Sequence, residues 1–377
     1  MDVLLLSCGT GGGHDAAARA IAEELRRRGH SSQMLNPYTL KSERLAGRID
    51  RLYVGSVQKT PSLFGVVYRL GQLCRKLPFR SPVYHANRLM VPALEEYLEH
   101  NNFDAVITTH IFPAMMLTAL RRSGVETPVT IHIATDCVCI PFTEDCECDA
   151  YVVPAPDLVD AFAGCGLPLE KIYPLGIPVS AAFSLRASRE SERARLGLEL
   201  DTKYVLVSGG SMGGGSIGRA VAALSEAASR RDDTQLLVVC GSNAELFDEL
   251  HRAAMPNVTP LGYTKDMAAY MRAADLFVTK PGGLSSTEAA VCGAALIHTA
   301  AIPGCETYNA EYFSSHGMSR LCDATPEALS AALDLLDDSA ARERMRERQR
   351  RFVNPYAAAD ICALAERLSG GRVRAAV

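Results

Sequence analysis

The sequence predicts an α/β protein with two doubly wound, Rossmann-like domains, each built around a parallel sheet. Short apolar runs alternate with helical segments in both halves of the chain, which is the order of parallel strands joined by crossover helices. Glycine-rich turns follow the first strand of each half and several later strands. A length of 377 residues with 48% hydrophobic residues is sufficient for two separate cores.

Composition and charge exclude several classes of protein. The net charge of −4 and the pI of about 6.2 argue against binding to nucleic acid. No apolar run approaches the roughly 18 residues of a membrane-spanning helix, and residues 1–7 fit a first strand better than a signal peptide. The 12 cysteines are scattered among apolar neighbours, so we expect reduced thiols in a cytosolic protein.

The first domain is expected to span residues 1–180. Its expected segments are a strand at 3–7, a glycine loop at 8–14, a helix at 16–28, and strands at 32–35, 103–108, 129–134 and 150–153. Residues 181–202, with a charged helix at 188–197, are expected to connect it to the second domain.

The glycine loop before His14 excludes two common nucleotide sites. A dinucleotide site requires an acidic residue after the second strand, where Asn36 and Pro37 stand. A phosphate loop of the nucleotide hydrolases requires Lys and Ser or Thr, where His14 and Asp15 stand. At a helix N-terminus the dipole favours the neutral imidazole, which suits a general base. The alternative is that His14 caps its own helix.

Two further groups follow strands of the first domain. Asp136 comes directly after the strand at 129–134, and such strand ends line the crevice of an open α/β sheet. It is therefore a second candidate base or orienting group, or else a loop cap. Four thiols lie close by, and we expect free thiols rather than zinc ligands because their one-residue gaps suit zinc poorly; they are Cys137, Cys139, Cys146 and Cys148.

Residues 41–90 form a basic insertion in the first domain. They contain ten Lys and Arg against two acidic residues, with apolar residues at helical spacing. Basic amphipathic helices of this kind bind anionic membrane surfaces, although a helical insertion that only packs on its domain is the alternative. The candidate membrane contacts are Arg44, Arg48, Arg51, Arg69, Arg75 and Lys76.

The second domain, at residues 203–356, repeats the alternation of strands and glycine turns. Strands are expected at 204–208, 235–240, 258–261, 275–279 and 295–299. The turn at Lys280-Pro281-Gly282-Gly283 opens a helix, so it is either a pyrophosphate cradle at a helix N-terminus or a packing joint. Because several such turns follow strands of one sheet, they should converge on one wall of a crevice.

These motifs resemble a known family over nearly the whole chain. The chain resembles the two-domain GT-B glycosyltransferases that include monogalactosyldiacylglycerol synthases, bacterial diacylglycerol glucosyltransferases and, more distantly, the lipid-linked N-acetylglucosaminyltransferase of peptidoglycan synthesis. The matching motifs are Gly11-Gly12-Gly13-His14, Thr135-Asp136, Gly176-Ile177-Pro178-Val179, Lys280-Pro281-Gly282-Gly283-Leu284, and Pro303-Gly304 with Glu306 and Asn309.

The resemblance implies two domains facing across a cleft, with a UDP-sugar held mainly by the second. By analogy residues 262–267 line the uracil pocket, Gly282 and Gly283 meet the pyrophosphate, Glu288 meets the ribose, and Glu306 with Asn309 meets the sugar. The donor residues that it implies are Gly13, Ser211, Met212, Gly241, Asn243, Gly262, Tyr263, Thr264, Met267, Lys280, Pro281, Gly282, Gly283, Leu284, Glu288, Pro303, Gly304, Glu306 and Asn309.

The implied reaction is an inverting transfer of a hexose to a lipid hydroxyl, without a metal or other cofactor. His14 or Asp136 removes the proton of the hydroxyl, and helix N-termini stabilise the leaving UDP. The basic insertion would hold the lipid acceptor at the inner face of the cell membrane. The carboxyl-terminal helix, at 357–377, is expected to pack back on the first domain.

One segment departs from the family pattern. Many members carry His and Trp shortly after the Thr-Asp pair, whereas residues 137–142 here contain neither, which leaves the acceptor open. The hexose is open as well, and N-acetylglucosamine transfer to another lipid-linked acceptor is an alternative. A soluble UDP-sugar 2-epimerase and a non-catalytic nucleotide-sugar sensor are alternatives of other classes.

Overall fold

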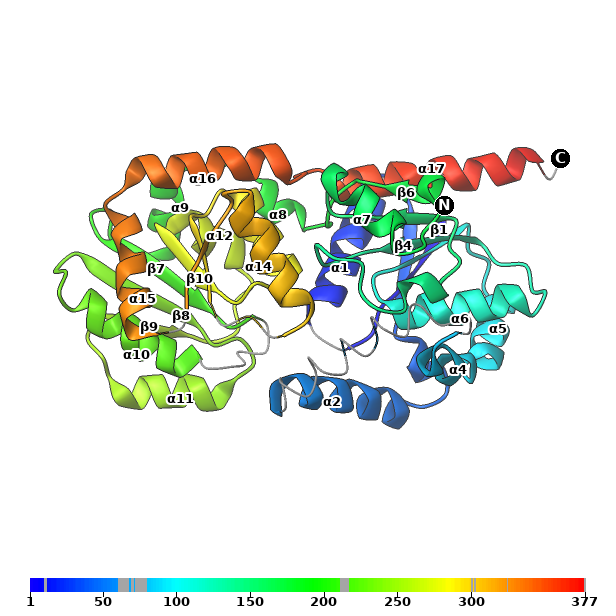
Figure 1. The fold of residues 1–377 in the computed structure, drawn as a ribbon, viewed down its shortest axis with the longest axis horizontal. Coiled ribbons are helices and arrows are strands. Elements are labelled where there is room, and N and C mark those ends of the chain that lie inside the picture. Colours follow the sequence, from blue (N-terminus) through cyan, green and yellow to red (C-terminus); the bar gives the residue numbers. More distant parts are fainter. Residues whose placement is uncertain are drawn as a thin grey trace. The chain divides into compact units, whose positions relative to one another are not determined.

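The chain folds into two compact units in the computed structural model (Figure 1). The structure describes all residues except 10–11, 60–67, 69–70, 72–79, 211–216, 300, 302, 324 and 376–377. The first unit comprises Met1–Ala181, Pro303–Cys305 and Asn354–Val377, and the second unit comprises Ala182–Ile302 and Glu306–Val353.

The first unit contains a six-stranded parallel sheet in the order β2-β1-β3-β4-β5-β6. Its strands are β1 (Asp2–Leu6), β2 (Ser31–Leu35), β3 (Ala105–Thr108), β4 (Val129–Ile133), β5 (Ala150–Val152) and β6 (Ile172–Tyr173). The strand order reverses between β1 and β3. Loops that leave the carboxyl ends of these two strands therefore meet at the point where open α/β sheets form their sites.

Strand β1 is buried on both faces, as expected of a parallel sheet covered by helices. Val3 and Leu5 belong to one core cluster, while Leu4 and Leu6 belong to another on the opposite face. The continuous apolar sequence of β1 follows directly from this two-sided burial. The helices of this unit are α1 (Gly12–Arg27), α2 (Glu43–Lys59), α4 (Pro82–Arg88), α5 (Val91–Glu99), α6 (Ile111–Arg122), α7 (Val159–Ala163) and α17 (Ala357–Ala375).

The last helix, α17, packs on the first unit although it follows the second unit in sequence. Ile361, Leu364 and Ala365 join the core cluster that contains β1 and α1. The Arg28 guanidinium donates to the Glu366 carboxylate and to the Ala359 carbonyl. The helix is therefore tied to the first unit by both apolar and charged contacts.

The second unit contains a six-stranded parallel sheet in the order β12-β11-β10-β7-β8-β9. Its strands are β7 (Lys203–Ser208), β8 (Thr234–Val239), β9 (Val258–Leu261), β10 (Leu276–Thr279), β11 (Leu296–His298) and β12 (Arg320–Leu321). Here the order reverses between β7 and β10. The turn at 280–283 leaves β10 and therefore lies at the switch point of its own sheet.

Helices cover both faces of the second sheet (Figure 1). They are α8 (Ala181–Ser184), α9 (Arg189–Leu196), α10 (Ile217–Ala228), α11 (Ala244–Ala253), α12 (Met267–Ala273), α13 (Gly283–Cys292), α14 (Cys305–Ser315), α15 (Pro326–Ala332) and α16 (Ser339–Phe352). Single 3₁₀ turns occur at Pro37–Leu40, Thr143–Asp145, Pro156–Leu158, Leu169–Lys171 and Leu333–Leu336. Among the described residues, no helix is long and apolar enough to cross a bilayer.

The structure differs from the expected elements at three places. Helix α1 begins at Gly12, so His14 lies in its first turn and not in the preceding loop. Residues 182–202, which we expected as a connection, belong to the second unit because buried Arg193 pairs with Asp275. The two-residue strands β6 and β12 were not expected, because strands this short have no recognisable periodicity.

Candidate active site

The His14 side chain is fixed by the loop that follows β3. Its Nδ1 lies 2.6 Å from the Thr109 carbonyl oxygen, and the Thr109 hydroxyl donates to the His14 carbonyl at 3.0 Å. The Thr135 hydroxyl, after β4, lies 3.3 Å from the same Nδ1. These contacts join the carboxyl ends of three adjacent strands. Since His14 bonds across the sheet edge and not to its own helix, the structure contradicts the capping alternative.

These contacts set the tautomer of His14. A carbonyl oxygen only accepts hydrogen bonds, so Nδ1 carries the proton and the Nε2 lone pair remains available. Burial lowers the pKa of His14 below its usual value, while Asp136, the Thr109 carbonyl and Asp15 act in the opposite direction. His14 is therefore neutral at neutral pH, and nearby acidic groups can stabilise its protonated form. This is the electrostatic setting of a general base.

His14 and Asp136 line one small cavity of about 20 Å³. Asp136 is half-buried and close enough to His14 to affect its pKa. The structure thus brings together the two candidate bases that follow β1 and β4. The other residues that line the cavity are Thr109, His110, Ile111, His132, Ile133, Ala134, Thr135, Val138, Ile140, Thr143 and Phe162.

Two further histidines lie in this cavity: sequence reasoning placed His110 at the crevice without giving it a role, and it missed His132. His110 caps α6 by accepting the Phe112 amide, and its ring contacts that of His14 edge to face at 4.7 Å. His132 lies in β4 with 3% of its surface exposed. The position of His132 could have been predicted from the alternation in β4. Val129, Ile131 and Ile133 face one core cluster, so Thr130 and His132 between them must face the opposite side of the sheet.

Asp50 is a second residue that sequence reasoning missed. It lies on α2, and a Cβ atom added at Gly9 would come within 2.4 Å of its Oδ2. Gly9 therefore permits this approach, and a larger residue there would require the Asp50 side chain to move. Burial and the neighbouring Asp15 carboxylate raise the pKa of Asp50. The available signal was its charge, since it is one of only two acidic residues within the basic segment at 41–90.

In the second unit, the turn at 280–283 exposes a helix N-terminus. Gly282 is the N-cap of α13, has an extended backbone and provides no side-chain cap. The first amides of α13 are therefore available for an anion such as a pyrophosphate. The Lys280 ammonium lies 2.5 Å from the Glu306 carboxylate, and the Lys280 stem passes over Gly210, whose φ is +81°. A cation paired with one carboxylate and the uncapped first amides of a helix thus occur at one turn.

Asn309 supports this turn from below. It is completely buried, and its side-chain amide donates to the Pro281 carbonyl at 3.1 Å. The structure therefore gives Asn309 a supporting position, and its expected contact with the sugar stays a prediction. Glu306 is also buried and is engaged by Lys280, so its expected sugar contact requires that this ion pair open.

Glu288 lies in the second turn of α13 and is half-buried. It has no hydrogen bond or ion pair with any residue that the structure describes. Burial raises the pKa of its carboxyl to about 8. The same helix is tied to β11 because the fully buried His298 ring binds Ser286 at 2.9 Å and Ser319 at 3.1 Å. An unpartnered carboxyl on a fixed helix is a suitable acceptor for ligand hydroxyls.

The remaining predicted donor residues lie along the carboxyl edge of the second sheet. Gly241 and Asn243 follow β8, and the Asn243 side chain caps α11 by accepting the Leu246 amide, which gives it a structural role. Residues 262–267 follow β9, where Tyr263 is 74% exposed. Pro281, Pro303 and Gly304 lie at the turns before α13 and α14, Leu284 lies in the first turn of α13, and Gly13 lies in α1 of the first unit. Ser211 and Met212 are outside the described residues.

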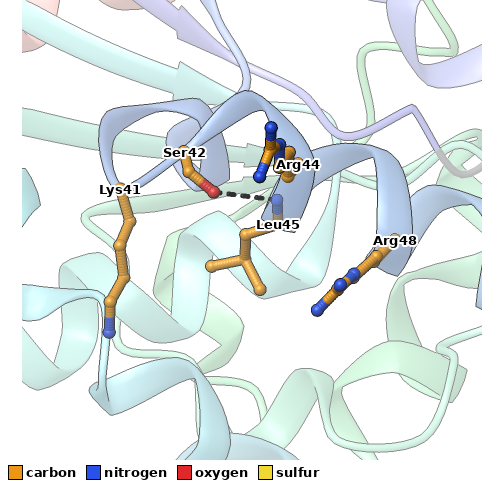
Figure 2. A pocket seen from close by; sticks show the side chains of 5 residues that line it. All are labelled: Lys41, Ser42, Arg44, Leu45 and Arg48. Atoms are coloured by element: carbon orange, nitrogen blue, oxygen red, sulfur yellow. Dashed lines mark hydrogen bonds between the residues drawn. The ribbon is translucent and has the colours of Figure 1, made fainter.

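A basic surface lies at the start of α2. Lys41, Ser42, Arg44, Leu45 and Arg48 line a hollow of about 410 Å³, and Figure 2 shows the Lys41 and Arg48 side chains on either side of Leu45. Arg44, Arg48 and Arg51 are exposed, whereas Ala46 and Ile49 pack on the core. The first turns of α2 therefore present cations outward while part of their apolar face is already covered. Arg69, Arg75 and Lys76 are outside the described residues.

The four clustered thiols are core residues. Cys137, Cys139, Cys146 and Cys148 are all buried, and burial raises the pKa of Cys146 and Cys148. Within the part of the chain that the structure describes, no group of three or more His, Cys, Asp or Glu could hold a metal ion. The zinc alternative therefore has no ligand set among these residues.

Both units are similar to known protein families. Residues 14–179 match the monogalactosyldiacylglycerol (MGDG) synthase family, and residues 204–360 match the glycosyltransferase family 28 C-terminal domain. The processive diacylglycerol beta-glucosyltransferase of Bacillus pumilus is 24% identical over 350 residues, which are 92% of this chain and 89% of that protein. The counterpart in Staphylococcus carnosus is 33% identical over 214 residues, which are 56% of this chain and 54% of that protein.

The MurG structure of Acinetobacter baumannii is similar to this chain with a TM-score of 0.63 over 97% of this chain and 99% of that one, at 18% identity. Together the fold and the site define a glycosyltransferase with the GT-B fold. The first unit belongs to the MGDG synthase family, and the second unit carries the glycosyltransferase family 28 C-terminal domain. The predicted fold class, family and enzyme class are therefore confirmed.

Proposed function

We propose that this enzyme transfers a hexose, with inversion, from a UDP-sugar to the free hydroxyl of a diacylglycerol-type lipid. The observation that carries the proposal is the neutral His14, fixed through Nδ1 by Thr109 and lying beside Asp136. The relatives named as processive diacylglycerol beta-glucosyltransferases favour glucose as the hexose and diacylglycerol as the acceptor.

In the proposed reaction, His14 Nε2 takes the proton of the lipid hydroxyl as its oxygen attacks the anomeric carbon. The bond between that carbon and the UDP oxygen breaks in the same step, and Asp136 stabilises the imidazolium that forms. The amides at the N-terminus of α13 and the Lys280 ammonium stabilise the charge that develops on UDP. No metal is required for this step, because amides and an ammonium supply the stabilisation.

Donor binding is proposed to open the Lys280–Glu306 ion pair. The pyrophosphate would attract the Lys280 ammonium, and the released Glu306 carboxylate could then accept hydrogen bonds from sugar hydroxyls. Glu288 would accept hydrogen bonds from the ribose. The buried Glu306 carboxylate would lose its bond to Lys280 and gain hydrogen bonds from the sugar. The new bonds would therefore offset the cost of keeping this carboxylate buried.

The reaction is tested by incubating the purified protein with UDP-glucose, UDP-galactose or UDP-N-acetylglucosamine and dioleoylglycerol in mixed vesicles. We expect a hexosyl-diacylglycerol, identified by mass, together with one UDP per transfer. Lipid-independent conversion of UDP-N-acetylglucosamine to its 2-epimer would contradict the proposal. That control is warranted because a UDP-GlcNAc 2-epimerase of Neisseria meningitidis has a similar fold, with a TM-score of 0.61 over 96% of this chain and 99% of that one at 13% identity.

We further propose that the basic surface of α2 holds the enzyme on the cytoplasmic face of the membrane. Replacing Arg44, Arg48 and Arg51 together with glutamate should weaken binding to vesicles that contain phosphatidylglycerol by at least about 100-fold, since each basic residue contributes about 1 kcal/mol at such surfaces. Vesicle co-sedimentation at low and high salt measures this, because screening weakens the attraction.

The matched control reverses Arg344, Arg350 and Arg351, which are exposed residues of α16, the other arginine-rich helix. It makes the same change in net charge and is expected to leave vesicle binding intact. An equal loss in both triple variants would show that net charge alone governs binding. A loss of UDP binding in the α2 variant would show that this segment is structural.

A further inference from the structure

His132 is a buried polar side chain that the proposed reaction does not yet use. It lies on the face of β4 opposite Ile131 and Ile133, and 3% of its surface is exposed. The nearest aromatic neighbour is Tyr151, with ring centroids 6.4 Å apart. Among the residues that the structure describes, neither ring nitrogen of His132 has a hydrogen-bond partner, and Nδ1 is fully enclosed.

An unsatisfied imidazole at such a site is unusual. Neutral histidine has one N–H donor and one acceptor nitrogen, and buried groups of this kind are nearly always paired. Burial, together with the nearby His14, lowers the pKa of His132 to about 4, so the ring is neutral at physiological pH. It therefore offers an N–H donor whose partner must come from outside the chain.

The cavity beside His132 shows where that partner can lie. His14, His132 and Asp136 line the same space of about 20 Å³, and one water-sized oxygen needs about 10–15 Å³. The space therefore accepts a single hydroxyl oxygen between the base and an unpaired donor. A contrast is provided by His298, the buried histidine of the second unit, whose two nitrogens are both bonded by serine hydroxyls.

We propose that His132 positions the attacking hydroxyl of the acceptor. Its N–H donates to the hydroxyl oxygen while His14 Nε2 accepts the proton of the same hydroxyl. The two histidines then have different roles, because Thr109 holds one as a base and the other remains a neutral donor that does not compete for the proton. This inference rests on the proposed role of His14.

Two substitutions distinguish the hydrogen bonding of His132 from the space that its side chain fills. His132→Phe keeps the ring and removes the donor, so it should lower kcat/KM for dioleoylglycerol by about 10- to 100-fold, which is the usual effect of one lost hydrogen bond in a buried site. Because Nδ1 is enclosed, the donor toward the cavity is Nε2–H; His132→Gln can place an N–H near that position and should retain most of the activity. UDP affinity should be unchanged in both variants, and slow hydrolysis of the UDP-sugar without lipid should fall in parallel.

Stability provides the readout that distinguishes positioning from structure. Because His132 has no partner, His132→Phe should unfold at the same temperature as the wild type or higher. The matched His298→Phe variant should unfold at a lower temperature, because it leaves Ser286 and Ser319 without their partner. Unchanged kcat/KM in His132→Phe, with His14→Ala inactive, would overturn this inference alone. An active His14→Ala variant would overturn the proposed role of His14, and the absence of hexosyl-diacylglycerol with the wild type would overturn the proposed function itself.

A measurement on the wild type decides the question if His132→Phe does not fold. In protein labelled with ¹⁵N-histidine, the ring signals of His132, assigned through His132→Gln, should shift on addition of dihexanoylglycerol and not on addition of UDP. Signals of His132 that are insensitive to the short-chain lipid would overturn the proposal.

Discussion

Replacing His14 with alanine is expected to lower kcat by about 10²- to 10⁴-fold, the usual contribution of a general base. The loss follows because no other described group of the first unit has its lone pair fixed in the same way as His14 Nε2, whose partner nitrogen is held by Thr109. UDP affinity should be little changed, since most of the predicted donor residues lie in the second unit. Initial rates and calorimetric titration with UDP measure the two quantities.

The matched control for this variant is His85→Ala. His85 is exposed on α4 of the same unit, so its removal should leave kcat within about twofold, the size expected of a surface substitution. If His14→Ala retained wild-type kcat, the base would have to be Asp136 and the proposed tautomer would be irrelevant to the reaction.

The pH profile provides a further check on the same base. Only neutral His14 can accept the proton, so kcat/KM should fall as the pH decreases through the pKa of His14 and be level above it. Since that pKa is below its usual value, the acid limb should lie below pH 6.5. Asp136→Asn removes a group that raises the pKa of His14, so the limb should move to still lower pH while the plateau also falls.

Replacing Glu288 with alanine should raise the Kd for UDP by about 10- to 100-fold, as expected for a lost hydrogen bond to a charged group. The physical reason is the unpartnered position of this carboxyl on α13. Glu327→Ala is the control, because this glutamate is exposed in the first turn of α15. Wild-type protein should bind UDP that lacks both ribose hydroxyls as weakly as Glu288→Ala binds UDP. If it does not, Glu288 does not contact the ribose.

The raised pKa of Glu288 adds a pH signature to this prediction. A carboxyl with a pKa of about 8 in the folded protein and 4.5 ordinarily takes up a proton on folding within that window, so its contribution to stability decreases as the pH rises from the lower to the higher value. Ribose hydroxyls bind best to the ionised form, so UDP affinity should rise with pH up to about 8. Glu288→Gln should lack this rise, and a profile shared by both proteins would refute the assignment.

Much of the fold could be predicted from local patterns. The apolar run of β1 and the glycine turns after β1, β7 and β10 indicated parallel strands with loops at one edge, and the structure has these elements in the same order. Element ends were less predictable. Helix α1 starts at Gly12 because His14 is bonded to Thr109 from within the first turn, and this contact is 95 residues distant in sequence.

Part of the donor site also required the structure. Asn309 and Asn243 were expected to contact the donor, and the structure adds that they support the Pro281 turn and cap α11, while the donor contacts stay predictions. Lys280 and Glu306 were both expected at the site, yet their ion pair could not be predicted. The residue types in a loop and the strand before it predict that the loop belongs to the donor site. Which partner each side chain binds depends on residues that other loops place beside it.

The sequence by itself determined the class of fold, the family and the loops that carry the chemistry. Periodicity and glycine turns are local patterns, so they can be recognised from neighbouring residues alone. Only the tertiary structure decided which nitrogen of His14 is free, that Glu288 has no partner among the described residues, and that His132 shares a cavity with Asp136. The physical reason is that protonation and hydrogen bonding depend on burial and on partners distant in sequence, which meet only where the order of strands reverses.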